Sequence, residues 1–166
     1  MTNSTTDVAI IMGSDSDLPI VEASFAILDS FGVNYTKNVM SAHRTPHEVM
    51  ELIKTSEKNG CKVFIAAAGM AAHLAGAVAA HSTRPVIGIP IESGGMGGMD
   101  SLLSTAMMPP GVPVATVAVG KAGAKNSAIL AVQILATSDD GLAAKLSEYK
   151  SNMRDEVLKK DQALNS

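Results

Sequence analysis

The sequence predicts a three-layer αβα sandwich built on a parallel β-sheet. Apolar runs of strand length alternate along the chain with segments whose apolar residues recur at helical spacing, an alternation typical of βαβ units. The apolar runs are continuous rather than interrupted by polar residues, which indicates strands buried on both faces. We therefore expect a single domain over residues 1–166, with a core at about 7–137 and an extra C-terminal helix at about 139–160.

The chain opens with a strand, a helix and a second strand. The first strand is expected at Val8–Met12. Leu18–Phe31 then shows helical spacing of apolar residues, and Gly32 follows as a stop signal. A weaker apolar alternation predicts the second strand at Asn34–Met40.

The second helix is expected to begin at Thr45. Threonine is a common N-cap, Pro46 suits the first turn, and Glu48 stands three residues after Thr45. This spacing predicts a capping box, in which the two side chains each bond a backbone N–H at the start of the helix.

Three further strands and helices alternate in the second half, with a glycine-rich loop at Ile91–Met99. The expected strands are Lys62–Ala67, Pro85–Ile89 and Val114–Val119, and the expected helices are Met70–Ala80, Asp100–Met107 and Ala122–Ala136. A flavodoxin-like sandwich is the expected outcome of this order.

The chain after Thr137 predicts one long, charged helix from Asp140 to Leu158. Its apolar residues form a single stripe: Leu142, Leu146, Tyr149, Met153 and Val157. The stripe packs either on the chain's own sheet or on a neighbouring subunit, because the sandwich is already complete without it.

Composition and charge argue against several classes of function. A net charge of −3 gives no electrostatic basis for nucleic-acid binding, and 3 Phe, 2 Tyr and no Trp leave few platforms for base stacking. The single cysteine, Cys61, cannot form an internal disulfide, which fits a reducing, cytoplasmic compartment. Its position at the start of a strand favours a buried or edge thiol over a nucleophile.

One segment approaches the length of a membrane span. Val63–Ala80 carries His73 as its only polar side chain, but it is rich in alanine and interrupted by Gly69 and Gly76. A buried strand, a tight loop and a small-residue helix are therefore expected, with no membrane partner. Residues 1–6 lack the basic and apolar regions of a signal peptide.

Ligands of open parallel sheets bind beyond the carboxyl ends of the strands, where three loops are expected to meet. The first loop, Gly13–Asp17, offers a phosphosugar the hydroxyls of Ser14 and Ser16 and the unpaired N–H groups of a helix start. Asp17 is expected to accept hydrogen bonds from ribose hydroxyls, or else to cap the helix. The loop matches neither a dinucleotide-binding fingerprint nor a Walker A motif.

The second and third loops carry histidines. In the second, Ser41, His43 and Arg44 follow a strand and precede a helix; an imidazole exchanges a proton near neutral pH, and a guanidinium is a fixed cation for phosphate or carboxylate. In the third, Gly69 lets a ligand approach the backbone, and His73 is either a second ligand contact or a core histidine. No His, Asp and Cys grouping has metal-ligand spacing, and no serine stands in the elbow of an acyl-transfer hydrolase.

Together these loops resemble those of the 5-(carboxyamino)imidazole ribonucleotide mutase family of purine biosynthesis. The matching segments lie in the expected order: Met12–Asp17, Ser41–Pro46, Ala71–Leu74, Asp100–Ser104, Met108–Pro109, Gly111–Thr116, and Gly120–Gly123 with Asn126. The resemblance implies a flavodoxin-like subunit and a homo-octamer whose active sites use several chains. It also implies a small-molecule ribonucleotide substrate and an isomerase that needs neither cofactor nor metal.

The resemblance also implies residue roles. The histidine that matches His43 is that family's general acid–base, and the residues that match Ser14, Asp17 and Arg44 bind the nucleotide. His43 would protonate the carbamate nitrogen, carbon dioxide would leave and be attacked by the ring carbon, and His43 would take the proton from that carbon. Such a reaction needs a closed, dry pocket that keeps the gas.

Some positions depart from the family pattern. Met70 replaces a usual Gly, Ala75 a Pro and Met107 a Gln, and Ser93–Gly98 is unusually rich in glycine. A related branch, aminoimidazole ribonucleotide carboxylases that use free carbon dioxide, usually has Lys where this chain has Arg44, so the mutase is favoured. The alternatives are such a carboxylase, a non-catalytic phosphosugar-binding module, and a structural interaction protein that uses its C-terminal helix.

Overall fold

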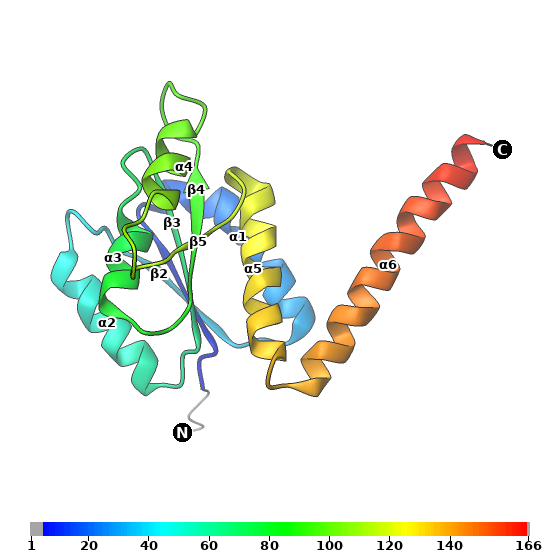
Figure 1. The fold of residues 1–166 in the computed structure, drawn as a ribbon, viewed down its shortest axis with the longest axis horizontal. Coiled ribbons are helices and arrows are strands. Elements are labelled where there is room, and N and C mark those ends of the chain that lie inside the picture. Colours follow the sequence, from blue (N-terminus) through cyan, green and yellow to red (C-terminus); the bar gives the residue numbers. More distant parts are fainter. Residues whose placement is uncertain (1–4, 166) are drawn as a thin grey trace.

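The computed structural model describes residues 5–165 and contains a five-stranded parallel sheet. The strands are β1 (Val8–Met12), β2 (Tyr35–Val39), β3 (Val63–Gly69), β4 (Val86–Ile91) and β5 (Ala115–Thr116), in the spatial order β2-β1-β3-β4-β5. The helices are η1 (Asp15–Asp17), α1 (Leu18–Phe31), α2 (Pro46–Lys58), α3 (Leu74–His81), α4 (Met99–Ala106), α5 (Gly120–Ala136) and α6 (Asp140–Leu164). The predicted flavodoxin-like α/β fold is confirmed (Figure 1).

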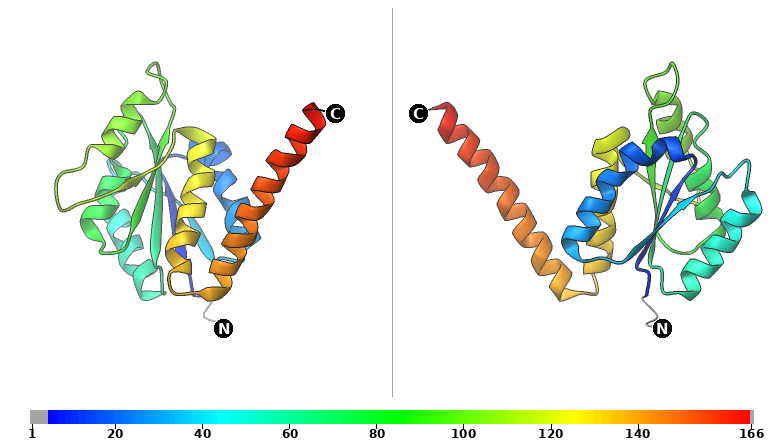
Figure 2. Two further views of the ribbon diagram at one scale, coloured as in Figure 1. Left: turned by 45° about the vertical axis from the view of Figure 1, so that its right-hand side comes forward. Right: turned by 180° about the vertical axis from the view of Figure 1, so that it is seen from behind.

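Each face of the sheet is covered by its own helices. Successive residues of a strand point to opposite faces, so Ile10 and Met12 of β1 pack with α1 and α5, whereas Ala9 and Ile11 pack with α2 and α3. Figure 2 shows α1 and α5 together on one side of the sheet. These four β1 side chains are buried, so the end of the strand is held firmly beneath the loop that follows it.

The start of α3 differs from the prediction. The helix begins at Leu74 rather than Met70, because Met70 adopts a φ of 53°, in the left-handed region, and turns the chain away from β3. His73 is the N-cap of α3, and its N–H donates to Ala71 O at 2.8 Å. Its side chain is exposed rather than packed in the core, so the alternative of a core histidine is wrong.

The start of α2 lacks the predicted capping box. No side chain caps the helix; instead, Thr45 Oγ1 accepts a hydrogen bond from Ser41 N at 2.9 Å and donates one to Ser41 O at 3.1 Å. The hydroxyl is therefore engaged in closing the loop before the helix. Glu48 lies in the first turn of α2, where its negative charge interacts favourably with the helix dipole and stabilises the helix.

The edge strand β5 is shorter than the predicted Val114–Val119. Only two of its residues pair with β4, Ala115 with Ile87 and Thr116 with Gly88. The ladder stops there because the chain turns towards α5, whose first residue, Gly120, has a φ of 73°. An edge strand has pairing on one side only, so little is lost when it is short.

Helix α6 leaves the sandwich at an angle, as Figures 1 and 2 show. Its first turns pack on the α1–α5 layer through Leu142, Leu146 and Tyr149. The ring centroids of Tyr149 and Phe31 are 5.7 Å apart. Further along, the apolar residues are exposed: Met153, Val157, Leu158 and Leu164. The predicted stripe is thus covered by the chain itself only in its first half.

Residues 63–80, whose length approaches that of a membrane span, form β3, a turn and most of α3. Among residues 5–165, none of the helices combines the length and the apolar character that a membrane crossing requires. Residues 1–4, which make up most of the N-terminal segment predicted to lack signal-peptide features, lie outside the described residues.

Cys61, just before β3, is fully buried. Its Sγ donates a hydrogen bond to Val63 O at 3.3 Å, and burial raises the pKa of the thiol to about 11. A neutral thiol of this kind is a poor nucleophile. Of the two positions predicted for the thiol, buried or at a sheet edge, the structure shows the buried one.

Candidate active site

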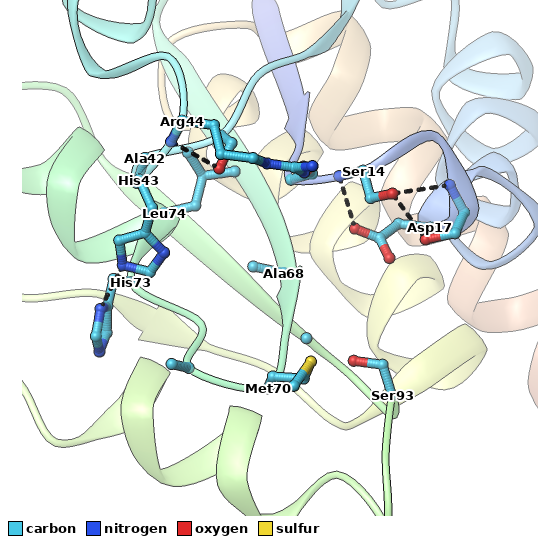
Figure 3. Close-up of a pocket in the computed structure, with 15 residues that line it drawn as sticks. Ser14, Asp17, Ala42, His43, Arg44, Ala68, Met70, His73, Leu74 and Ser93 are labelled. Carbon is cyan, nitrogen blue, oxygen red and sulfur yellow. Dashed lines mark hydrogen bonds between the residues drawn. The ribbon is translucent and has the colours of Figure 1, made fainter.

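A cavity of about 500 Å³ opens at the carboxyl ends of the strands, a volume suited to a small-molecule ligand. Its walls come from the loops after β1, β2 and β3, with one residue from the loop after β4 (Figure 3). All eight residues singled out in the sequence line it: Ser14, Ser16, Asp17, Ser41, His43, Arg44, Gly69 and His73. The prediction that three loops converge at this edge is therefore correct.

The loop after β1 is held by its own hydrogen bonds. Ser14 caps the short helix η1: its Oγ accepts from Ser16 N at 3.3 Å, and its N–H donates to Asp17 Oδ2 at 3.2 Å. Ser16 Oγ adds a bond to Ser14 Oγ at 2.9 Å. This reciprocal arrangement is a capping box, and it places two hydroxyls and a carboxylate on the cavity wall.

Asp17 is a buried carboxylate. It occupies the N-cap position of α1, as the alternative interpretation predicts, but its side chain makes no capping hydrogen bond to that helix. Burial raises the pKa of Asp17 above its usual value of 3.8, and the hydrogen bonds from Ser14 and Ser16 partly oppose that rise. The carboxylate is an acceptor that can bind hydroxyl groups of a ligand.

Arg44 brings positive charge to the cavity. Its backbone N–H donates to Ser41 Oγ at 3.2 Å, which fixes the loop, and its Nη2 donates to Gly13 O at 3.1 Å. The side chain thereby spans from the loop after β2 to the loop after β1, towards Ser14 (Figure 3). No carboxylate of residues 5–165 forms an ion pair with it, so its charge is available to an anion.

The two histidines of the cavity touch one another. His43 Nε2 lies 2.8 Å from His73 Nδ1, and the rings meet edge to face with their centroids 4.9 Å apart. Figure 3 shows the two rings close together at the cavity wall. One nitrogen donates and the other accepts, so each ring restricts the orientation and tautomer of the other.

The third loop approaches the loop after β4 closely. A Cβ on Gly69 would overlap Ser93 Oγ and lie 2.9 Å from Ser93 Cβ, so any larger residue would force Ser93 to move. Met70 is 62% exposed and lines the cavity beside them.

The cavity also contains three residues that were not predicted as ligand-binding residues from the sequence: Ser93, Leu74 and Met70. The remaining walls, Gly13, Ala42, Ala68 and Ala71, offer backbone and small apolar side chains. Among residues 5–165, no group of three or more His, Cys, Asp or Glu side chains is arranged to hold a metal ion.

Comparison of the whole chain with known proteins identifies its family. The model of the family described as AIR carboxylase matches residues 7–156. The chain belongs to the AIR carboxylase family. The N5-carboxyaminoimidazole ribonucleotide mutase of Bacillus subtilis (strain 168) is 51% identical over 157 residues, which cover 95% of this chain and 97% of that protein. The mutase of the same name from Thermotoga maritima is 50% identical and covers 95% and 91% of the two chains.

Solved structures agree with this membership of the AIR carboxylase family. The crystal structure of Treponema denticola PurE superposes with a TM-score of 0.87 at 29% identity, covering 96% of this chain and 98% of that one. Because the relatives that match nearly the whole chain are mutases, this family member is an enzyme, an isomerase that transfers a carboxyl group within its substrate. A purely structural or non-catalytic binding role does not fit these relatives.

Proposed function

We propose that this enzyme converts 5-(carboxyamino)imidazole ribonucleotide to 5-amino-4-imidazolecarboxylate ribonucleotide, with His43 as its acid–base. The names of the relatives supply the substrate class. The role proposed for His43 is supported by its position next to Arg44 on the wall of the cavity, which is also lined by the serines of the loop after β1. The cavity thus offers a proton carrier for the reaction, a cation for the phosphate and a carboxylate for the ribose hydroxyls of such a substrate.

The proposed reaction proceeds in two proton transfers. His43 gives a proton to the carbamate nitrogen, the C–N bond electrons pass to that nitrogen, and carbon dioxide is released. Carbon 4 of the ring then attacks the carbon dioxide, and His43 takes the proton that carbon 4 still bears. The imidazole ends in the protonation state in which it began, so one residue serves both steps.

Binding of the nucleotide is assigned to the remaining residues. Arg44 and the Ser14 and Ser16 hydroxyls would hold the phosphate, since a guanidinium and hydroxyl donors at a helix start suit an anion. Ser41 would support them through its bond to the Arg44 backbone. Asp17 would accept from ribose hydroxyls. Gly69 brings the backbone close to the carboxyl group, and His73 holds the His43 ring.

A carboxylase that uses free carbon dioxide is the second candidate, and the description of the matching family model favours it. Purified enzyme is given either the carbamate ribonucleotide, labelled with ¹³C in its carboxyl group, or aminoimidazole ribonucleotide plus bicarbonate. A mutase forms labelled product from the carbamate even in excess unlabelled bicarbonate. Product that forms only from the second mixture identifies the carboxylase, and no product from either refutes both.

The proposal extends to assembly and location. We expect a homo-octamer in the cytoplasm, with the exposed second half of α6 in contact with other subunits. The support is the apolar surface of Met153, Val157, Leu158 and Leu164, which a monomer would leave in water.

A further inference from the structure

We infer that Ser104, on α4, is a positioning residue for the active site, acting through the loop between β3 and α3. Ser104 does not line the cavity, and it lies 32 residues along the chain from the loop residue it bonds. The inference rests on the function proposed above, because the site it serves is the one assigned to that reaction.

Ser104 Oγ lies within hydrogen-bond distance of both ends of the turn that forms the cavity floor. It accepts a hydrogen bond from Ala72 N at 2.9 Å and lies 3.2 Å from Met70 O, to which its hydroxyl can donate. The same hydroxyl can instead donate to Asp100 O, 2.7 Å away in its own helix. One serine thus ties α4 to the residues that follow β3.

The turn needs such a constraint. Met70 is the only non-glycine residue of 5–165 with a positive φ, at 53°, and side chains other than glycine occupy that region only where neighbouring contacts enforce it. Ala72 is almost completely buried, so its N–H requires a partner inside the protein, and Ser104 Oγ provides one. Without the hydroxyl, the Ala72 N–H loses its partner on α4, and Met70 O loses its contact with that helix.

The turn in turn positions the histidine pair. His73 follows Ala72 directly, and its ring meets His43 at 2.8 Å. A shift of the Ala72 backbone therefore moves His73, and His43 loses the contact that restricts its ring. Displacements of about 1 Å in a catalytic arrangement can cost roughly a hundredfold in rate, so a residue outside the cavity can govern turnover.

The test compares Ser104→Ala, Ser104→Thr and Ser127→Ala. Ser127 is a matched control, because it is a buried helix serine whose hydroxyl donates only within its own helix, to Ala124 O at 2.8 Å. Ser104→Ala should lower kcat roughly ten- to a hundredfold with KM changed by less than about threefold. Ser104→Thr, which keeps the hydroxyl, should restore most of kcat, and Ser127→Ala should leave it near the wild-type value.

Two measurements without substrate separate this inference from the proposed reaction. In Ser104→Ala, the Ala72 amide should lose protection from hydrogen exchange, and the ¹⁵N imidazole signals of His43 and His73 should shift. These signals decide the inference even if the wild type fails to turn over the carbamate. Unchanged imidazole signals, or an equal fall of kcat in Ser127→Ala, overturn it. Should Ser104→Ala not fold, Ser104→Cys, whose thiol is a weak hydrogen-bonding group, undergoes the same measurements.

Discussion

His43 Nε2 and His73 Nδ1 lie 2.8 Å apart, joining the loop after β2 to the first residue before α3. If His73 Nδ1 donates the hydrogen bond, His43 Nε2 accepts it, and a neutral His43 carries its own proton on Nδ1. If His43 Nε2 donates instead, His73 Nδ1 accepts, and a neutral His73 carries its own proton on Nε2. The pair therefore couples the proton on the proposed catalytic ring to the tautomer of its neighbour.

His43→Asn should lower kcat by at least about a hundredfold, because an amide keeps the size and one hydrogen bond but cannot carry a proton between the two steps. Nucleotide affinity should change by less than about tenfold, since Ser14, Asp17 and Arg44 remain. Steady-state kinetics beside direct binding of the nucleotide product measure the two effects separately.

His73 provides the discriminating control. His73→Asn places an amide near the position of Nδ1 and should retain more activity than His73→Ala, which removes the contact with His43. A His43 variant that turns over near the wild-type rate while a His73 variant is dead would assign the acid–base role to His73 instead.

Arg44→Ala should weaken binding of the nucleotide by about 2–3 kcal/mol, because it removes hydrogen bonds between charged groups in a partly enclosed site. Substrate and product should be affected alike, since both carry the same phosphate. Titration calorimetry with the product tests this, with Arg84→Ala as the control at an exposed arginine outside the cavity. Equal affinities for wild type and Arg44→Ala would remove Arg44 from the phosphate site.

Asp17→Asn should stabilise the fold in a pH-dependent way. The pKa of Asp17 is raised in the native state, so between the unfolded value and the raised value the native state binds more protons, and the free energy of unfolding falls as pH rises. Asparagine cannot ionise, so the stability difference between variant and wild type should grow through that interval and stay constant above it. Urea unfolding of both proteins from about pH 3 to pH 8 measures it; a difference independent of pH contradicts the raised pKa.

Gly69→Ala should destabilise the fold and disturb the cavity, because the added Cβ overlaps Ser93; overpacking of this kind costs about 1–3 kcal/mol. Ser93→Gly alone should cost little, and the Gly69→Ala/Ser93→Gly protein should recover much of the loss. A double-mutant cycle on unfolding free energies gives the coupling. Additive effects would mean that the two residues do not compete for the same space.

Removing residues 153–166 should leave the sandwich folded and disrupt its assembly. The truncation keeps Leu142, Leu146 and Tyr149, which pack on α1 and α5, and deletes the exposed apolar half of α6. Light scattering should find an octamer for the full chain and a smaller species for the truncated one. A full-length monomer at micromolar concentration refutes the assembly, and an intact truncated octamer refutes the part played by α6.

The site was predictable where it depended on strand ends. Gly13–Asp17 follow an apolar run whose burial the sequence makes plain, and Ser41–Arg44 follow a weaker strand pattern. A parallel sheet brings the carboxyl ends of its strands to one edge. The position of His73 was not predictable, because it depends on Met70 adopting a positive φ, which methionine disfavours. Local propensity predicts continuous helix there, whereas the turn is contacted by Ser104 from a distant helix, which sequence spacing does not reveal.

Two other differences have other origins. Thr45 has the sequence signature of a cap, but its hydroxyl bonds Ser41 instead, a competition between local partners that spacing alone does not resolve. Ser93 lies in a glycine-rich loop whose sequence gives no distances, so its approach to Gly69 appears only in three dimensions.

The isolated thiol of Cys61 makes this enzyme a convenient subject for labelling kinetics. With one cysteine in the whole chain, any mass added by a thiol reagent falls at one known position beneath the sheet. Since the buried thiol is protected while β3 is in place, modification at neutral pH has to wait for that strand to open. The rate at which this single mass shift appears therefore reports how readily the native protein opens at β3. Comparing the rates with and without nucleotide shows how far a ligand bound at the opposite end of β3 suppresses that opening.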